Sequence, residues 1–263
     1  MKHFVRFLAV YLIIVTLIFT FYLNINNERE EHLDFTKSEL DGIKYLKGIY
    51  NIAIDLAIYQ GFVETKDSKE KIESSRKNLL SSIDTIYTLQ KKYPQFKDSQ
   101  FNKQLEQIKK PEMHEKIIYE FFDYINHENY RIGDVSKLLF ETDRKSYFLS
   151  SLITHYMPEY LISVLITHNV AEEFLHEYSI SDYKMERFIQ HNKLMYLSSE
   201  ELTNIIKLLK PYDDTKKLQN LMTSIVKELD NSPISKNATV VKKDIKLAKK
   251  YLDVSHRLLE LSY

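Results

Sequence analysis

The 263-residue chain contains no cysteine and no tryptophan, only four glycines and only five prolines. An average chain of this length would have roughly 18 glycines and 13 prolines. Folds that depend on glycine turns, such as β-barrels, dinucleotide-binding sheets and P-loop enzymes, are therefore disfavoured, and their glycine motifs do not occur in the sequence. The lack of cysteine excludes thiol catalysis, disulfides and thiolate zinc sites but leaves the redox compartment open. We therefore do not expect an enzyme.

An excess of charge of one sign is also lacking, because Lys plus Arg and Asp plus Glu both number 37. No net charge attracts the chain to nucleic acid, and we expect no nucleic-acid partner. The lysines of 236–250 lie beside apolar residues at helical spacing, which favours a solvated helix face over a binding patch. The hydrophobic fraction of 44% is too high for a disordered chain, and the length allows a sizeable helical core.

One long hydrophobic run is present, close to the N-terminus. Residues 7–23 are 17 consecutive uncharged residues, FLAVYLIIVTLIFTFYL, with basic residues before them and mainly acidic residues after them. About 20 such residues span the hydrocarbon core of a bilayer. The charge asymmetry predicts a cytoplasmic segment over 1–6, a transmembrane helix over 7–25 and an extracytoplasmic domain over 28–263. A cleaved signal peptide is the alternative, but small residues of a cleavage site do not follow the run.

The rest of the chain has the apolar periodicity of helices, for example over 43–57, 149–164 and 202–209. Capping residues and prolines divide it into helices expected over about 3–65, 68–93, 98–128, 132–177, 182–209, 213–230 and 236–263. The predicted fold class is therefore all-α. A transmembrane helix continues into an elongated multi-helix bundle of the four-helix type, built as one module or two.

Two motifs stand out from this helical pattern. The first is ELDGIKY at 39–45, followed by an apolar helix that closes on YQG at 59–61. The second is DVSKLLFETDRKSYFL at 134–149, followed by MPEYL at 157–161. Together they resemble the all-helical extracytoplasmic input domain of bacterial transmembrane signalling receptors, which include chemoreceptors, sensor histidine kinases and diguanylate cyclases. The family pattern reads E-x-x-G-x-x-Y, H-R-G, D-x-S-N-L-x-L-D-P-D-x-D-S-Y-Y-L and L-P-E-L, and the resemblance covers about 35–263.

The resemblance implies a ligand-sensing input region that passes the binding of a small polar molecule across the membrane as a displacement of helices. It implies a homodimer in the bacterial inner membrane, with most of the chain in the periplasm and with no cofactor. Any kinase or cyclase activity would belong to an output domain that these residues do not include. Two departures concern the ligand: Gln60 replaces the arginine of H-R-G, and the acids and proline of D-P-D-x-D become Glu141-Thr142-Asp143-Arg144-Lys145.

The candidate site residues are polar or conformationally special residues in or beside these motifs. Those expected to bind the ligand are Tyr45, Gln60, Tyr147, His155 and Glu159. Those expected to have a motif or structural role are Glu39, Gly42, Gly61, Asp143, Ser146 and Pro158.

Each of these residues also has a structural interpretation. Tyr45 and Tyr147 could be large core residues whose hydroxyls are satisfied inside the bundle. The glycines at 42 and 61 could allow close helix packing or end a helix, whereas Gly61 could instead make room for a ligand. Asp143 with Ser146 fits a helix cap.

Pro158 has two interpretations of equal weight. Within one continuous helix over 146–177 it would free the carbonyl of Thr154, kink the helix and open a small cavity for a ligand. Alternatively, Pro158 begins a new helix, whose N-terminal dipole favours Glu159.

Two further functions compete with the receptor. A di-iron enzyme requires two E-x-x-H pairs, and the sequence has one, Glu173 with His176, so no metal site is expected. A non-catalytic, membrane-anchored helical scaffold or docking protein of the cell envelope needs no ligand and is the main alternative.

Overall fold

The computed structural model describes residues 2–64, 66–110, 113–140, 143–176, 181–212, 215–217 and 219–220. Every regular element within these ranges is helical, which confirms the all-α prediction for this part of the chain. The helices expected over 213–230 and 236–263 fall largely or wholly outside the described residues.

The elements in chain order are α1 (Lys2–Glu64), α2 (Lys69–Lys92), η1 (Pro94–Phe96), α3 (Ser99–Ile108), α4 (Glu115–Val135), η2 (Leu138–Phe140), α5 (Arg144–Ser151), η3 (Leu152–Tyr156), α6 (Met157–His176) and α7 (Asp182–Leu209). Of these, η1 and η2 are single 3₁₀ turns and η3 is a π-helical turn.

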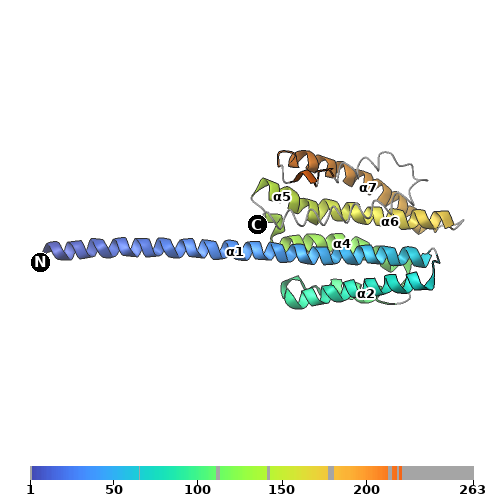
Figure 1. The fold of residues 1–263 in the computed structure, drawn as a ribbon, viewed down its shortest axis with the longest axis horizontal. Helices are drawn as coiled ribbons and strands as arrows, with labels where there is room; N and C mark the ends of the chain where they lie inside the picture. The colour runs from blue at the N-terminus through green and yellow to red at the C-terminus, as the bar shows by residue number, and fades with distance from the viewer. Residues whose placement is uncertain are drawn as a thin grey trace.

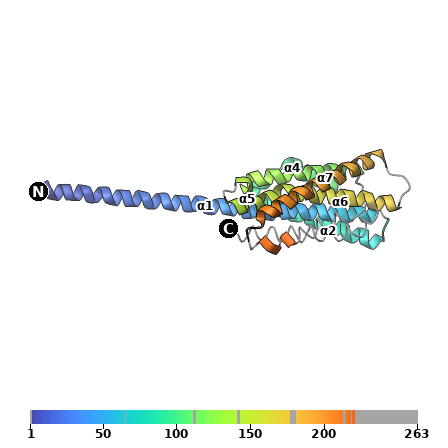
Figure 2. The same cartoon turned by 90° about the horizontal axis from the view of Figure 1, so that it is seen from above.

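Helix α1 organises the bundle. Its 63 residues correspond to about 95 Å of helix, and its N-terminal part extends well beyond the other helices (Figure 1). The C-terminal part packs against α2, α4 and α6, while α7 packs on α6 and α3 on α4 (Figure 2). We call the end of the bundle that contains α5 the near end. The far end is where α1 finishes at Glu64 and where α4 and α7 begin.

The predicted membrane span coincides with the extending part of α1. A helical conformation over 7–25 agrees with the structure, but the side chains of 1–29 lie outside its described part. Among the residues whose side chains the structure describes, no helix has a stretch long and apolar enough to cross a bilayer. Insertion of 7–25 in a membrane stays a prediction.

Two helix starts are fixed by serine caps that the sequence prediction did not single out. The hydroxyls of Ser68 and Ser181 accept hydrogen bonds from the backbone N–H groups of Lys71 and Lys184, at 3.4 and 3.2 Å. Because each cap satisfies an N–H group that has no partner within its helix, it fixes where the helix begins. Accordingly, α2 and α7 match the predicted ranges 68–93 and 182–209 closely.

Two predicted boundaries are wrong. The helix expected over 98–128 is two helices, α3 and α4, and Pro111 lies in the sequence between them, where a proline cannot continue a helix. The break expected near 130 falls instead after Val135, because Gly133 is accommodated within α4. The chain leaves α4 through Lys137, whose φ of 69° is left-handed.

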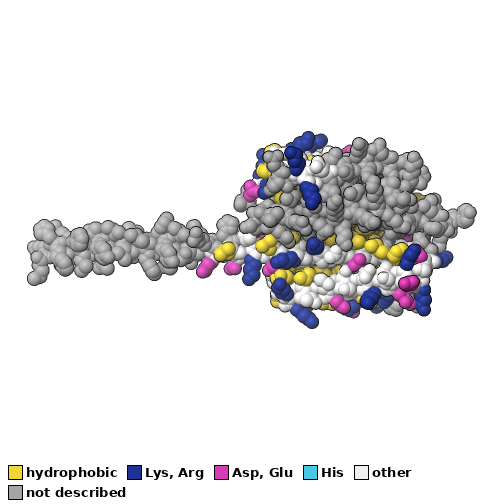
Figure 3. All heavy atoms as spheres, in the orientation of Figure 1, with side chains coloured by type: hydrophobic (Ala, Val, Ile, Leu, Met, Phe, Trp, Pro, Cys, Tyr) yellow, Lys and Arg dark blue, Asp and Glu magenta, His cyan; other side chains and the backbone are white. Residues whose placement is uncertain are grey.

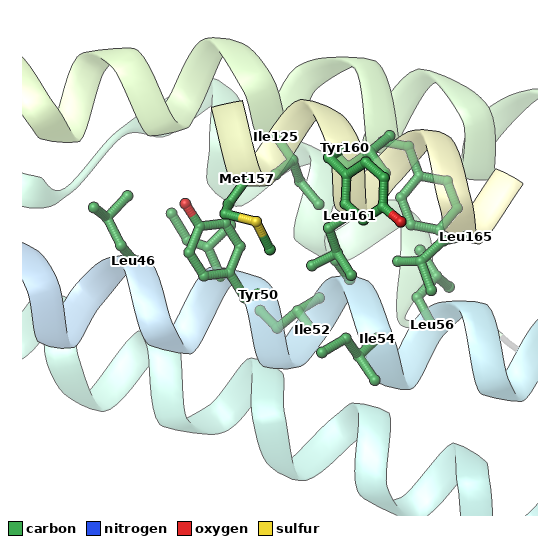
Figure 4. Packing of buried hydrophobic residues seen from close by; sticks show 14 of the residues in the cluster. Leu46, Tyr50, Ile52, Ile54, Leu56, Ile125, Met157, Tyr160, Leu161 and Leu165 are labelled. Atoms are coloured by element: carbon green, nitrogen blue, oxygen red, sulfur yellow. The ribbon is translucent and has the colours of Figure 1, made fainter. Parts of the chain in front are cut away.

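The core is one continuous cluster of buried side chains, to which all seven α-helices contribute. Figure 4 shows its centre, where side chains of α1 interdigitate with those of α4 and α6. The labelled members are Leu46, Tyr50, Ile52, Ile54, Leu56, Ile125, Met157, Tyr160, Leu161 and Leu165. On the face shown in Figure 3, Lys and Arg side chains are interspersed with Asp and Glu over the described surface.

The two sequence motifs meet at Gly42. A Cβ atom placed on this glycine would lie 2.3 Å from Cβ of Ser136 and 2.4 Å from its Oγ. Ser136 is fully buried just after α4 and belongs to the second motif. The structural interpretation of Gly42, close helix packing, therefore holds, because no larger residue fits between α1 and the end of α4.

We expect Gly42→Ala to lower the free energy of unfolding by about 1–3 kcal/mol, since the added methyl group must push backbone-linked atoms apart. Gly61→Ala is the matched control in the same helix, because a Cβ there would meet only Oδ1 of Asn169 at 3.8 Å. Alanine should be neutral or stabilising by up to about 1 kcal/mol at that position. Urea unfolding of the full chain in detergent measures both, and equal effects would contradict this account of Gly42.

The interface between α6 and α7 contains a buried histidine. His191 is 3% exposed, its Nδ1 lies 3.5 Å from Oγ of Ser163, and burial lowers its pKa to about 4. The nearby Asp123 carboxylate opposes this shift, and the Arg187 guanidinium adds to it. The folded chain therefore holds this imidazole neutral.

The buried imidazole predicts acid sensitivity. Between pH 6.5 and about 4 the unfolded chain binds a proton at this position that the folded chain does not, so stability falls as the pH falls. The loss should reach roughly 3 kcal/mol at the lower limit. His191→Gln should flatten the plot of melting temperature against pH in this window. A profile as steep as that of the wild type would show that another group is responsible.

Candidate functional site

The five predicted ligand-binding residues lie in different parts of the bundle. Tyr45 is completely buried in the core, whereas Tyr147 is 49% exposed on α5. His155 and Glu159 lie together on η3 and the start of α6, and Gln60 lies near the far end of α1. A single site that contains all five does not exist in the structure.

Tyr45 has the structural role that its core interpretation predicts. Its hydroxyl accepts a hydrogen bond from Nε2 of Gln90 at 2.8 Å. Its ring packs against that of Phe96, with the two ring centroids 5.3 Å apart. Burial raises its pKa, so the phenol stays neutral. Close by, the buried Glu128 carboxylate forms an ion pair with Arg131 at 2.7 Å, and Arg131 also donates to the carbonyl of Phe96. These contacts tie the turn η1 to α1, α2 and α4.

The motif residues around α5 also have structural roles. The carboxylate of Asp143 accepts a hydrogen bond from the backbone N–H of Ser146 at 2.9 Å, which caps α5. This hydrogen bond lowers the pKa of Asp143. Ser146 itself is buried. Glu39 of the first motif is completely buried on α1, at the near end of the bundle.

Pro158 lies in one continuous helical path, as the first of its two interpretations predicts. The π turn η3 precedes it, and the N–H of Met157 bonds to the carbonyl of Leu152, five residues earlier. The next donor in this pattern would be Pro158, which has no N–H, so the carbonyl left over is that of Ile153 and not that of Thr154. The hydroxyl of Tyr50 on α1 donates to this carbonyl. Figure 4 shows Tyr50 reaching from α1 toward Met157.

A second group of polar aromatic residues surrounds the same π turn on the outside of the bundle. The hydroxyl of Tyr130 on α4 forms a hydrogen bond with the imidazole of His155. Burial, and then the Glu159 carboxylate, raises the pKa of Tyr130. The hydrogen bond links α4 to η3. His155 thus contacts a tyrosine of α4, and the Glu159 carboxylate acts on the same tyrosine through its charge.

Gln60, one of the predicted ligand residues, lines a cavity. A cavity of about 330 Å³ opens at the far end, within the size range of small-molecule sites. Its lining comes from the last turns of α1, the start of α4 and the segment before α4. The lining residues are Tyr59, Gln60, Val63, Glu64, Met113, Glu115 and Ile118.

A chain of polar contacts crosses this end of the bundle. Nδ2 of Asn169 on α6 donates to Oε1 of Gln60 at 3.1 Å, and Nε2 of Gln60 donates to Oε1 of Glu64 at 2.9 Å. Nζ of Lys184 on α7 then lies 3.5 Å from Oε1 of Glu64 and 3.4 Å from Oε2 of Glu115 on α4. Four helices are therefore joined through one cluster, which we call the far-end cluster.

Tyr59 adds a second connection beside the cavity. Its hydroxyl accepts a hydrogen bond from Arg76 on α2 at 3.3 Å, and the same guanidinium donates to the carbonyl of Lys109 at 2.8 Å. Arg76 thereby holds α1 and α2 to the C-terminal end of α3, where carbonyl groups have no partners within the helix. The YQG sequence at 59–61 contributes two lining residues and the weakly packed Gly61.

Sequence reasoning missed three charged members of the far-end cluster. Glu64 is four residues after Gln60, on the same face of α1, so helical spacing could have identified it. Glu115 and Lys184 belong to helices far away in sequence, and no local pattern marks them. The pair considered for a metal, Glu173 and His176, has side chains outside the described part. Within that part, no three His, Asp or Glu side chains gather in a way that could hold a metal ion.

The contact between Tyr50 and η3 can be tested by one substitution. Tyr50→Phe should lower the free energy of unfolding by about 1–3 kcal/mol, because the buried Ile153 carbonyl loses its donor. Tyr147→Phe, at a half-exposed hydroxyl, should change it by less than about 0.5 kcal/mol. Chemical unfolding of both variants provides the comparison. A Tyr50→Phe effect as small as the control would mean that this hydrogen bond does not support the π turn.

Comparisons with protein-family models, with curated proteins and with solved structures found no match. The two motifs and the far-end cavity are therefore the grounds on which a function can be assigned to this helical bundle.

Proposed function

We propose that this chain is the ligand-sensing input region of a bacterial membrane-bound signalling receptor, and that the far-end cavity is its ligand site. The observation that carries the proposal is the position of the cavity on α1. Gln60 and Glu64 line it from the last turns of the same uninterrupted helix that contains the apolar run at 7–23. A displacement of α1 at the cavity would be passed along about 55 Å of helix to that run.

The far-end cluster gives ligand binding a means to move α1. Helix α1 is tied to α6 through Asn169 and to α7 through Lys184, and α4 joins through Glu115. A ligand that replaces one of these contacts changes the relative energies of two helix arrangements and shifts the population between them. The cluster is largely buried, so its ion pairs are less screened by salt than surface pairs.

The rest of the proposal follows the resemblance of the two motifs to receptor input domains. It includes the periplasmic location, the anchor in the inner membrane, the homodimer and a separate output domain. Gly42 of the first motif packs against Ser136 of the second, and this contact between the two motifs supports the resemblance. The alternative, a membrane-anchored scaffold of the cell envelope, requires no ligand at the far end, so ligand binding distinguishes the two functions.

Thermal unfolding of the full chain in detergent, screened against small polar metabolites, tests the proposal. A true ligand at a hundredfold excess over its Kd should stabilise the fold by about 2.7 kcal/mol. Glu64→Gln should raise the Kd of the ligand at least tenfold, and so reduce or abolish the stabilisation. Glu73→Gln, at an exposed carboxylate of α2 paired with Lys69, is the matched control and should not affect it. A broad screen with no stabilising compound would favour the scaffold.

A further inference from the structure

Among its described lining residues, the far-end cavity has acidic side chains but no basic ones. Two of the seven are acidic, Glu64 and Glu115, and none is basic. The position at which the receptor family has arginine is Gln60, which donates to Glu64. A carboxylate ligand would therefore approach two carboxylates without an arginine to pair with, in a site partly shielded from water.

The ammonium group of Lys184 lies near both acids. Nζ of Lys184 lies 3.5 Å from Glu64 and 3.4 Å from Glu115, whereas charge-assisted hydrogen bonds are typically about 2.7–2.9 Å long. It is thus shared between the two carboxylates.

The lining of the cavity contains the two acids but not Lys184. Glu64 and Glu115 are lining residues, but Lys184 is not, and its side chain is only 11% exposed. The remaining lining is mainly apolar, from Val63, Met113 and Ile118. A small organic cation, with a charged nitrogen and an alkyl or aryl body, matches this combination of paired acids and apolar wall.

We propose that the far-end cavity binds a small amine, whose ammonium group enters between Glu64 and Glu115 and competes there with Lys184. This assignment rests on the proposed function and specifies its ligand class. Lys184 is then an internal occupant of the amine site. Its displacement removes the ion pairs that join the first turn of α7 to Glu64 of α1 and Glu115 of α4, which is the differential contact that a ligand-driven shift requires.

Chemical rescue tests the assignment. Lys184→Ala removes three methylene groups and the ammonium, and n-propylammonium has that same composition. The melting temperature of the full-length variant should fall relative to wild type, and n-propylammonium chloride should restore several degrees more than sodium chloride at the same concentration. In the wild type Lys184 competes with the amine, so the same stabilisation should require at least ten times more n-propylammonium. n-Propanol, which lacks the charge, should restore nothing.

Two variants define the site. Glu64→Gln combined with Lys184→Ala should lose the rescue, because one of the two acids is gone. Lys71→Ala, at an exposed lysine paired with Asp67, should show no rescue. Lys184→Gln keeps most of the stem and is the second background if the alanine variant does not fold; titration calorimetry should show tighter n-propylammonium binding to it than to wild type.

The outcomes separate the two proposals. Rescue or tighter binding that depends on Glu64 supports the amine site. Equal responses of wild type, both Lys184 variants and the Lys71 control overturn it. If the amine fails while another metabolite stabilises the chain through Glu64, only the ligand class is wrong. If no compound of any class binds, the proposed sensing function fails as well.

Discussion

The packing of one uninterrupted helix against three others is the constraint on which the rest of this structure depends. Helix α1 packs against α2, α4 and α6, and two of its glycines lie close to side chains of its neighbours. Gly42 meets Ser136, and a Cβ on Gly48 would lie 2.7 Å from Cδ1 of Ile86 on α2. The contact at Gly42 leaves no room for a larger residue and fixes the height of α1 relative to α4, and the contact at Gly48 brings α1 close to α2. All residues further along α1, including those of the far-end cavity, are positioned by that register.

The scarcity of glycine acquires a physical explanation from these contacts. A helical bundle has little use for glycine, because it destabilises a helix by about 1 kcal/mol relative to alanine. Three of the four glycines remain where a neighbouring helix or turn occupies the space of a side chain: Gly42, Gly48 and Gly133. Gly61 does not meet such a neighbour, and it lies beside the cavity-lining Tyr59 and Gln60.

Local signals allowed much of the fold to be predicted from the sequence. Asp143 was correctly interpreted as a helix cap, because a cap is a contact within four residues. The predicted helix over 98–128 ran through Pro111, although a proline marks a joint between helices, and the structure has α3 and α4 there. The expected membrane anchor over 7–25 stays a prediction.

The candidate site was less predictable, because it depends on contacts between distant segments. Gln60 was selected from a motif and does line a cavity, but Glu115 and Lys184 reach it from two other helices. Tyr45 and Tyr147 were selected by the same reasoning, and burial separates them: one is a core residue and the other is half exposed. A tyrosine in an amphipathic helix does not reveal from its spacing alone whether its hydroxyl meets a protein group, a ligand or water.

The π turn at Leu152–Tyr156 has a consequence for the far end of the bundle. A π turn accommodates one residue more than an α-helical turn, so it rotates every later side chain by about 100° relative to a plain α-helix. Asn169, which donates to Gln60, lies after this turn and takes part in that rotation. Evolutionary loss of the extra residue would leave α6 helical and its composition nearly unchanged, yet would turn a different face of the helix toward α1. The phase of α6, and not only its presence, is therefore part of the far-end cluster.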